Sequence, residues 1–157
     1  MIRVGMGFDV HKLVEGRDLW LGGIKIGHSM GLQGHSDADV LLHAVSDALL
    51  GAANMRDIGF HFPDTSAKTL DMDSKIILQR VVELIGEKGY KVINVDATIC
   101  AEQPKINPHV PAMKACMSAV MGIDEDQISI KATTTERLGF TGREEGMAAY
   151  AVCLIEK

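Results

Sequence analysis

The order of strand-like and helix-like patterns constrains the fold of this chain more than any other feature. Alternating or continuous apolar runs predict strands at 2–10, 19–26, 90–101, 128–134 and 147–155. Apolar positions at helical spacing predict helices at about 36–53 and 73–89 and a third that ends near Gly122. Gly22 and Gly23 indicate a bulge or sharp turn inside 19–26, and 27–35 is expected to be a loop. We expect an α+β fold: a mostly antiparallel or mixed sheet of four to five strands, with helices packed on one face and ferredoxin-like βαβ units.

Length and charge exclude several classes of protein. The 157 residues suit a single domain, 1–157, and 46% hydrophobic residues exclude a wholly disordered chain. The net charge of −5, without a run of Lys or Arg, argues against nucleic-acid or anionic-membrane binding. No apolar stretch is long enough for a membrane span, and Asp9 and His11 interrupt any secretory core. With three scattered cysteines, read as buried reduced thiols, we expect a cytoplasmic protein, in the bacterial cytosol.

Asp9, His11 and His43 form a candidate metal site. Asp9 and His11 are two residues apart at the end of the first predicted strand, so their side chains share one face. His43 lies on the first predicted helix, in a polar stripe with Asp39 and Asp47. If that helix packs on the strand, two imidazoles and one carboxylate supply the three ligands of an open, catalytic zinc site. The alternative is that Asp9 ends the strand, His11 lies at the surface and Asp47 satisfies His43.

Three further segments are candidates for binding phosphate or a base. Residues 54–70 lack clear periodicity and are a candidate active-site lid. Ala132 to Arg143 combines hydroxyls, free backbone N–H groups and a guanidinium, which suits a diphosphate, and Glu136 could hold a divalent cation there. The segment from Ala101 to Asn107 follows a predicted strand and contains a proline, so its backbone N–H and C=O groups are not paired in the sheet and could form hydrogen bonds to a nucleotide base. For the last two segments, an ordinary strand end followed by turns, or an ordinary strand-to-helix connection, is the more common interpretation.

Several motifs together resemble one family over essentially the whole chain. They are Gly7-Phe8-Asp9-Val10-His11, His35-Ser36-Asp37, His43 with Asp47, Asp57-Ile58-Gly59 with Phe62-Pro63-Asp64, Pro104-Lys105, and Lys131 to Gly142. In order and spacing they resemble the 2-C-methyl-D-erythritol 2,4-cyclodiphosphate synthases. One position departs from the family pattern, because Ser66 stands where the family usually carries an acid.

The resemblance implies an enzyme of the non-mevalonate isoprenoid pathway, a cyclising, CMP-forming lyase. Its substrate is 4-diphosphocytidyl-2-C-methyl-D-erythritol 2-phosphate, whose 2-phosphate attacks the β-phosphorus of its own diphosphate and releases CMP. It implies Zn²⁺ on Asp9, His11 and His43, and Mg²⁺ or Mn²⁺ on Glu136 with the substrate diphosphate. His35 and Thr134 match positions that stabilise the transition state.

The resemblance also implies a set of substrate contacts and an assembly. The substrate-binding residues would be Asp9, Val10, His11, His35, Ser36, Asp57, Ile58, Gly59, Phe62, Pro63, Asp64, Thr65, Ser66, Ala101, Glu102, Gln103, Pro104, Lys105, Ile106, Asn107, Thr133, Thr134, Thr135, Glu136, Phe140 and Arg143. Asp47 would fix the tautomer of a zinc histidine. The family forms homotrimers with active sites between subunits and a central cavity that can hold an isoprenoid diphosphate. We expect a single activity, without a fused cytidylyltransferase domain.

Two alternatives remain beside the synthase. A non-catalytic trimer could bind isoprenoid diphosphates or nucleotides, which the missing acid at Ser66 favours. The second alternative is that the metal is purely structural, although structural zinc sites almost always have four protein ligands rather than three.

Overall fold

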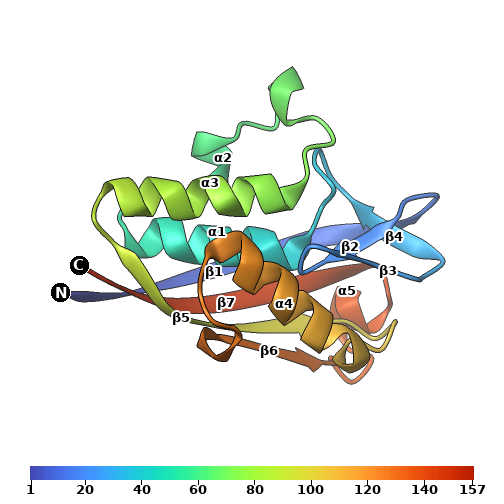
Figure 1. The fold of residues 1–157 in the computed structure, drawn as a ribbon. Helices are drawn as coiled ribbons and strands as arrows, with labels where there is room; N and C mark the ends of the chain where they lie inside the picture. Colours follow the sequence, from blue (N-terminus) through green and yellow to red (C-terminus); the bar gives the residue numbers. More distant parts are fainter.

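Five strands form one mixed sheet in the order β4-β1-β7-β5-β6 in the computed structural model, which describes residues 1–157 (Figure 1). They are β1 (Ile2–Glu15), β4 (Met30–Gln33), β7 (Gly146–Glu156), β5 (Lys91–Cys100) and β6 (Ile128–Thr133). Neighbouring strands are antiparallel except β5 and β6, which are parallel and joined through α4 (Val110–Met121). The expected α+β class is confirmed. Because the strands of this βαβ unit are direct neighbours, the topology does not establish ferredoxin-like units.

The long helices lie on one side of this sheet (Figure 1). Helix α1 (Val40–Ala52) contacts β1 and β7, α3 (Ser74–Glu87) packs on α1, and α4 contacts α3 and β6. Helix α1 is enclosed between the sheet and α3, and nearly all of its residues are buried. Its apolar residues contribute to one continuous hydrophobic core. A polar side chain on α1 that faces the sheet therefore lies in a mostly dry environment.

Short elements complete the fold. They are β2 (Leu19–Leu21), β3 (Ile24–Ile26), α2 (Ile58–His61), α5 (Gly139–Gly142) and the 3₁₀ turns η1 (Ala67–Thr69), η2 (Asn107–His109) and η3 (Glu125–Gln127). The predicted lid, 54–70, contains α2 and η1. None of the helices has the length and hydropathy of a membrane span.

The N-terminal part of the fold differs from the sequence prediction in two ways. Strand β1 continues past Val10 to Glu15, because residues 12–15 pair with β4, which lies inside the predicted loop 27–35. Helix α1 begins at Val40 with Asp39 as its N-cap, and not near Ser36 or Asp37. Ser36 and Asp37 instead accept backbone bonds in the turn just before the cap.

Asp39 joins the β2–β3 hairpin to the start of α1. Its carboxylate accepts the N–H groups of Gly22 at 3.0 Å, Gly23 at 2.7 Å and Leu42 at 3.1 Å. Gly22 and Gly23 both have positive φ, 61° and 79°, as a two-residue hairpin turn requires. Burial raises the pKa of Asp39, and the Gly23 and Leu42 N–H bonds oppose that shift.

The two faces of β7 have opposite surroundings. Ala149, Ala151 and Cys153 face the helices and are buried within the chain. The opposite face carries Tyr150 and Val152, and its apolar surface continues on β1. The exposed apolar side chains of β1 are Ile2, Val4, Met6, Phe8 and Val10. On β1 and β7, this face of the sheet is therefore apolar and uncovered by any helix of the same chain.

The chain ends lie together, at the left of Figure 1. The Lys157 N–H donates to the Met1 carbonyl at 3.2 Å, as an extension of the β1–β7 pairing. Asp9 and His11 lie farther along β1, at the opposite end of its pairing with β7.

Candidate active site

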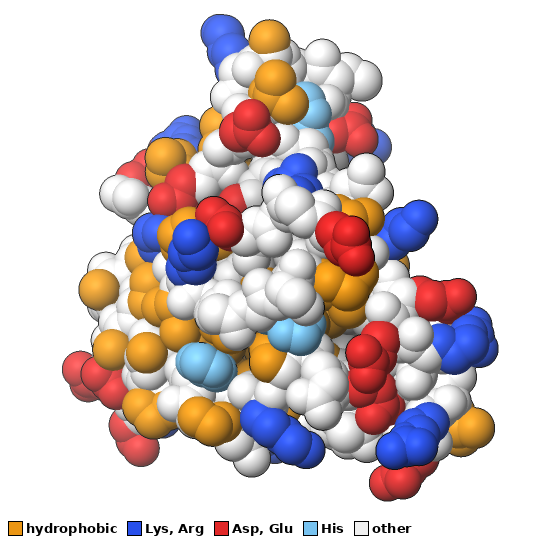
Figure 2. Space-filling model, turned by 90° about the vertical axis from the view of Figure 1, so that its right-hand side faces the viewer, with side chains coloured by type: hydrophobic (Ala, Val, Ile, Leu, Met, Phe, Trp, Pro, Cys, Tyr) orange, Lys and Arg blue, Asp and Glu red, His pale blue; other side chains and the backbone are white.

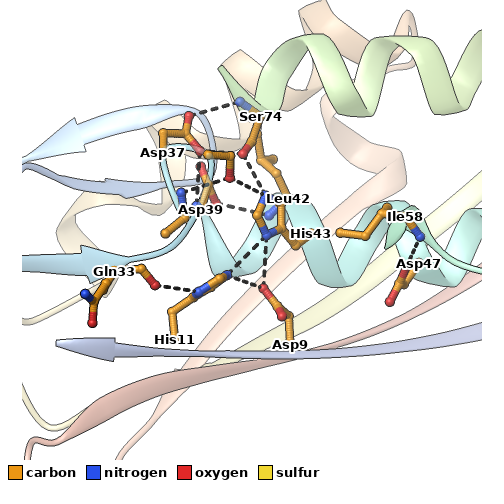
Figure 3. A network of polar contacts seen from close by, with 12 residues as sticks. Asp9, His11, Gln33, Asp37, Asp39, Leu42, His43, Asp47, Ile58 and Ser74 are labelled. Carbon is orange, nitrogen blue, oxygen red and sulfur yellow. Dashed lines mark hydrogen bonds and ion pairs between the residues drawn. The ribbon is translucent and has the colours of Figure 1, made fainter. Parts of the chain in front are cut away.

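Strand β1 and helix α1 bring three potential metal ligands together (Figure 3). Asp9 and His11 point to the face of β1 that carries α1, and His43 points from α1 toward them. Asp9 Oδ2 is 2.9 Å from His11 Nε2 and 3.1 Å from His43 Nδ1. The two ring nitrogens, His11 Nε2 and His43 Nδ1, are 3.3 Å apart. The predicted meeting of these three side chains is confirmed.

Two glycines on β1 make this meeting possible. A Cβ on Gly5 would lie 1.9 Å from the Ala48 carbonyl oxygen, and a Cβ on Gly7 would lie 1.9 Å from that of Ala44. The α1 backbone therefore rests directly on β1, at a distance that no other residue type allows. Because Ala44 follows His43, this close approach brings the His43 ring to the level of Asp9.

The donor set fits a divalent metal ion. A tetrahedral zinc ion with bonds of about 2.0–2.1 Å separates its ligand atoms by about 3.3 Å, close to the separations between these three atoms. His11 Nδ1 donates to the Gln33 carbonyl at 2.9 Å, so His11 Nε2 presents a lone pair to the site. Electron-rich atoms that face one another at such distances need a proton or a cation between them. Three protein ligands also leave a fourth position for a substrate atom.

The electrostatics of the three side chains agree with this interpretation. Burial by itself raises the pKa of Asp9, but hydrogen bonds and charge from His11 and His43 outweigh it and lower that pKa to about 2. Burial lowers the pKa of His11, but the hydrogen bond to Asp9, the charge of Asp9 and the bond to the Gln33 carbonyl together outweigh it, so the net shift is upward. The site therefore favours positive charge beside the Asp9 carboxylate, which is the charge that a bound metal ion supplies.

The metal ligands open into a cavity of about 380 Å³. The loop before α1 contributes His35 and Ser36 to its wall, and the lid contributes Ile58, Gly59, Phe62 and Asp64. Figure 2 shows the end of the molecule at which β2–β4 lie, where histidines are visible and acidic and basic side chains are interspersed. The sequence had singled out all of these wall residues as substrate contacts. Gly34, Thr69 and Ile77 also line the cavity and were not predicted as contacts; Thr69 lies inside the predicted lid, whereas Gly34 and Ile77 carry no local signal.

The other predicted substrate contacts on β1 and on the lid do not line this cavity. Val10 points to the uncovered face of the sheet, so only its backbone is near the metal ligands. Asp57 caps α2 by accepting from the Phe60 N–H at 2.9 Å. Pro63 and Thr65 are exposed on the lid. The Ser66 hydroxyl caps η1, and its carbonyl accepts from His35 Nε2 at 2.9 Å, which ties the lid to the cavity wall.

Asp47 does not have the role that the sequence suggested. Its Oδ1 accepts from the Ile58 N–H at 2.8 Å, and no bond to His43 is present. Burial raises the pKa of Asp47, and the Ile58 N–H opposes that shift. Asp47 therefore anchors the start of α2 and the lid, while the Nε2 atom of His43 contacts the hydroxyls of Ser74 and Ser36 instead.

A second, smaller cavity of about 150 Å³ lies at the ends of β5 and β6. Its lining comprises Ala101, Glu102, Pro104, Lys105, Ile106, Asn107, Thr133 and Thr134, all predicted contacts, and Ala132, which was not predicted. Gln103 is exposed beside it. Glu102 Oε1 accepts from the Thr135 and Arg137 N–H groups at 3.1 and 3.2 Å, which fixes the following turn.

The remaining predicted residues line neither cavity within this chain. Glu136 and Phe140 are exposed on the turn, and Arg143 pairs with Glu145 at 3.1 Å. The two cavities share no residue. The strand register pairs Asp9 with Ala149, Ala149 with Ile99, and Ile99 with Ala132. The two cavities therefore lie at the same end of the sheet, but three strand spacings, about 14 Å, apart.

The fold and the site together define an α+β protein with a candidate metal site of two histidines and one carboxylate, beside a cavity whose wall is formed in part by the predicted lid. The sequence model of the YgbB family matches residues 2–156, and the chain belongs to that family.

Relatives and solved structures agree with this assignment. The chain is 71% identical over 156 residues to a 2-C-methyl-D-erythritol 2,4-cyclodiphosphate synthase of Bacteroides thetaiotaomicron, covering 99% of this chain and 98% of that one. A solved synthase of the same name, in its CDP-bound form, superposes with a TM-score of 0.90 at 34% identity, covering 98% of this chain and 100% of that one. The bifunctional IspDF of Campylobacter jejuni gives a TM-score of 0.95 at 42% identity. That match covers 99% of this chain but only 42% of the bifunctional protein.

Proposed function

We propose that this chain, as a single domain of residues 1–157, converts 4-diphosphocytidyl-2-C-methyl-D-erythritol 2-phosphate into 2-C-methyl-D-erythritol 2,4-cyclodiphosphate with release of CMP. The reaction is a metal-dependent intramolecular phosphoryl transfer in non-mevalonate isoprenoid biosynthesis. The observation that carries the proposal is the open three-ligand centre of Asp9, His11 and His43 at the wall of a cavity that also contains His35 and Ser36. The name shared by relatives at 60–71% identity supports the substrate.

Asp9, His11 and His43 are the proposed ligands of a zinc ion, which two imidazoles and one carboxylate with an open position suit. When bound, such an ion polarises a phosphoryl oxygen and fixes its position. Glu136, exposed at the second half of the site, is the proposed ligand for Mg²⁺ or Mn²⁺ bound with the diphosphate.

The protein's own contribution is mainly positioning, because the attacking 2-phosphate is already an anion and needs no general base. The lid, through Asp57 to Gly59 and Phe62 to Ser66, covers the methylerythritol phosphate and excludes water. His35 retains its bond to the Ser66 carbonyl and, when doubly protonated, donates from Nδ1 to a phosphoryl oxygen. Thr134 donates to the departing phosphate, and the second cavity, with Lys105, takes the cytidine end.

A homotrimer completes this site. Because the two cavities lie on different parts of one chain and share no residue, we propose that each active site combines the metal cavity of one subunit with the second cavity of its neighbour. The uncovered apolar face of β1 and β7 supplies the contact between subunits. At the centre of the trimer this face would also line the cavity for an isoprenoid diphosphate.

Phosphorus NMR during incubation with the diphosphocytidyl substrate, zinc and magnesium tests the proposal. We expect cyclic diphosphate signals and an equal amount of CMP, and neither product in EDTA. His43→Ala should abolish both products, whereas His28→Ala, at a histidine outside both cavities, should retain them. Tight binding of the substrate by folded, zinc-loaded protein without turnover would contradict the enzymatic function and favour a binding protein.

A further inference from the structure

The ring nitrogen of His43 that faces away from the metal site has its own partners (Figure 3). His43 Nδ1 faces Asp9 and His11, and Nε2 lies 2.8 Å from the Ser74 hydroxyl oxygen and 3.2 Å from that of Ser36. Ser74 is fully buried and is the first residue of α3. The shorter of the two contacts therefore joins the metal ligand to a different helix.

The direction of the hydrogen bonds follows from Asp37. A serine hydroxyl has one proton to donate, and Ser74 Oγ donates it to Asp37 Oδ1. Ser74 Oγ can then only accept from His43, so the proton of the His43 ring lies on Nε2 and Nδ1 presents its lone pair to the metal site. The Ser36 oxygen already accepts the Ala38 N–H at 3.2 Å and is the more distant acceptor.

Asp37 is itself held in place from both sides. Its Oδ2 accepts the Ser74 backbone N–H at 3.0 Å, and its own N–H donates to the Met72 carbonyl at 3.2 Å. Asp39 N–H donates to Oδ1 at 3.2 Å. The carboxylate is thus fixed between the segment that enters α1 and the first turn of α3.

Asp9 and Ser74 favour different positions for the His43 proton. The Asp9 carboxylate, 3.1 Å from Nδ1, favours a proton on Nδ1, where it would block metal binding. The Ser74 oxygen favours a proton on Nε2. His11 faces the same choice, but the Gln33 backbone carbonyl decides it, and no side-chain substitution removes that acceptor.

We propose that Ser74, oriented by Asp37, is a positioning residue that fixes the tautomer and the ring orientation of His43 for metal binding. This inference deepens the proposed function, since it concerns the same metal site. Partners of this kind typically change metal affinity by about 10- to 100-fold when they are removed.

Zinc affinity, measured by chelator competition on variants shown to be folded by circular dichroism, provides the first test. Ser74→Ala should weaken zinc binding by about 10- to 100-fold, and Asp37→Asn should weaken it in the same direction. Combining the two substitutions should add little, because Asp37 acts through Ser74. The matched control is Ser46→Ala, the same substitution at a fully buried serine of α1 whose hydroxyl has no partner, and it should leave the affinity unchanged.

Long-range ¹H–¹⁵N NMR of the histidine rings in EDTA provides the second test, at a fixed pH at which His43 is neutral. We expect the Nε2–H form in the unmodified protein and in Ser46→Ala, and a shift toward Nδ1–H in Ser74→Ala. An Nδ1–H form in the unmodified protein would overturn the proposal without any variant. Equal zinc affinity in Ser74→Ala would overturn it as well.

Neither measurement depends on turnover, which separates this inference from the proposed reaction. Zinc binding that weakens as expected in a protein that forms no CMP would leave the positioning role intact and contradict the enzymatic function alone. If the unmodified protein binds no zinc, both the metal site and the role of Ser74 are wrong.

Discussion

The Cys153 thiol lies on the β7 face beneath α1 and is 1% exposed. Burial raises its pKa from 9.0 to about 11, with a small opposing effect from a backbone bond to Gly5. Between these two pH values the unfolded chain has lost the thiol proton and the folded chain has kept it. The free energy of unfolding should therefore be unaffected by this group below about pH 9 and fall by about 2–3 kcal/mol as the pH rises to 11.

Denaturant titrations of the unmodified protein and of Cys153→Ala across pH 8–11 measure this contribution. Lysines and tyrosines titrate in the same range in both proteins, so the difference between the two curves isolates Cys153. The free energy of unfolding of the unmodified protein, relative to that of Cys153→Ala, should fall as the pH rises from 9 to 11. A difference that stays constant with pH would show that the thiol ionises equally easily in the folded and unfolded chains.

At the scale of residues, the sequence predicted the candidate metal ligands better than the residues that form hydrogen bonds to them. The two-residue spacing of Asp9 and His11 is a local property of a strand, and it correctly placed both on one face. The partner of His43 was assigned to Asp47 because the two are four residues apart on α1. The actual partner, Ser74, is 31 residues away in sequence, and only the packing of α3 on α1 brings it there.

At the scale of elements, the contact between α1 and β1 depends on Gly7. We expect Gly7→Ala to push α1 away from the strand, because its Cβ would lie 1.9 Å from a backbone oxygen that cannot move alone. The free energy of unfolding should fall by about 1–3 kcal/mol or more. Zinc affinity should fall too, since His43 moves with the helix.

Gly51→Ala is the matched control for this prediction. Gly51 lies on α1, and a Cβ there would meet no atom within 4 Å. The added methyl should raise stability by about 0.5–1 kcal/mol through helix propensity and leave zinc affinity unchanged. Thermal unfolding and chelator competition measure both quantities, and normal zinc binding by Gly7→Ala would show that the close approach is not required.

The elements that sequence patterns missed are those that depend on distant pairing. Strand β4 has only four residues and includes Gly31, so it carries no recognisable alternation. It forms because the second half of β1 offers unpaired backbone groups alongside. Likewise, Asp39 was not identified as the helix cap, since its carboxylate also serves a hairpin turn 16 residues earlier.

At the scale of the whole molecule, the separation of the two cavities makes a prediction about mixtures of variants. His43→Ala affects one cavity and Lys105→Ala the other. We expect each variant alone to have little activity. When both are unfolded together in equal amounts and refolded, each mixed trimer should have one site with two intact halves, which is about a quarter of all sites in the sample, so CMP release should reappear.

Sedimentation of the same samples gives the assembly state, and the mixture should contain trimers. A Phe8→Lys variant provides the control, because a charge on the uncovered sheet face should prevent assembly and so prevent any recovery. An active mixture without trimers, or trimers without recovered activity, would show that the sites are not shared between subunits.

The sequence could not distinguish the two faces of the sheet. Both faces of β7 are apolar, and alternation alone does not say which one the helices cover. The small residues Ala149 and Ala151 face the helices because α1 lies so close to the sheet, which leaves larger side chains such as Tyr150 on the outside.

The pairing of Met1 with Lys157 has a consequence for protein engineering. Since the chain ends are adjacent and lie about 25 Å along β1 from Asp9, a short peptide could join them without disturbing the sheet. New ends could then be opened in an exposed turn elsewhere, such as the one at Lys88 and Gly89. Such a circularly permuted chain would have its new termini at the chosen turn, where another domain could be fused, and the strand order of the sheet would be unchanged.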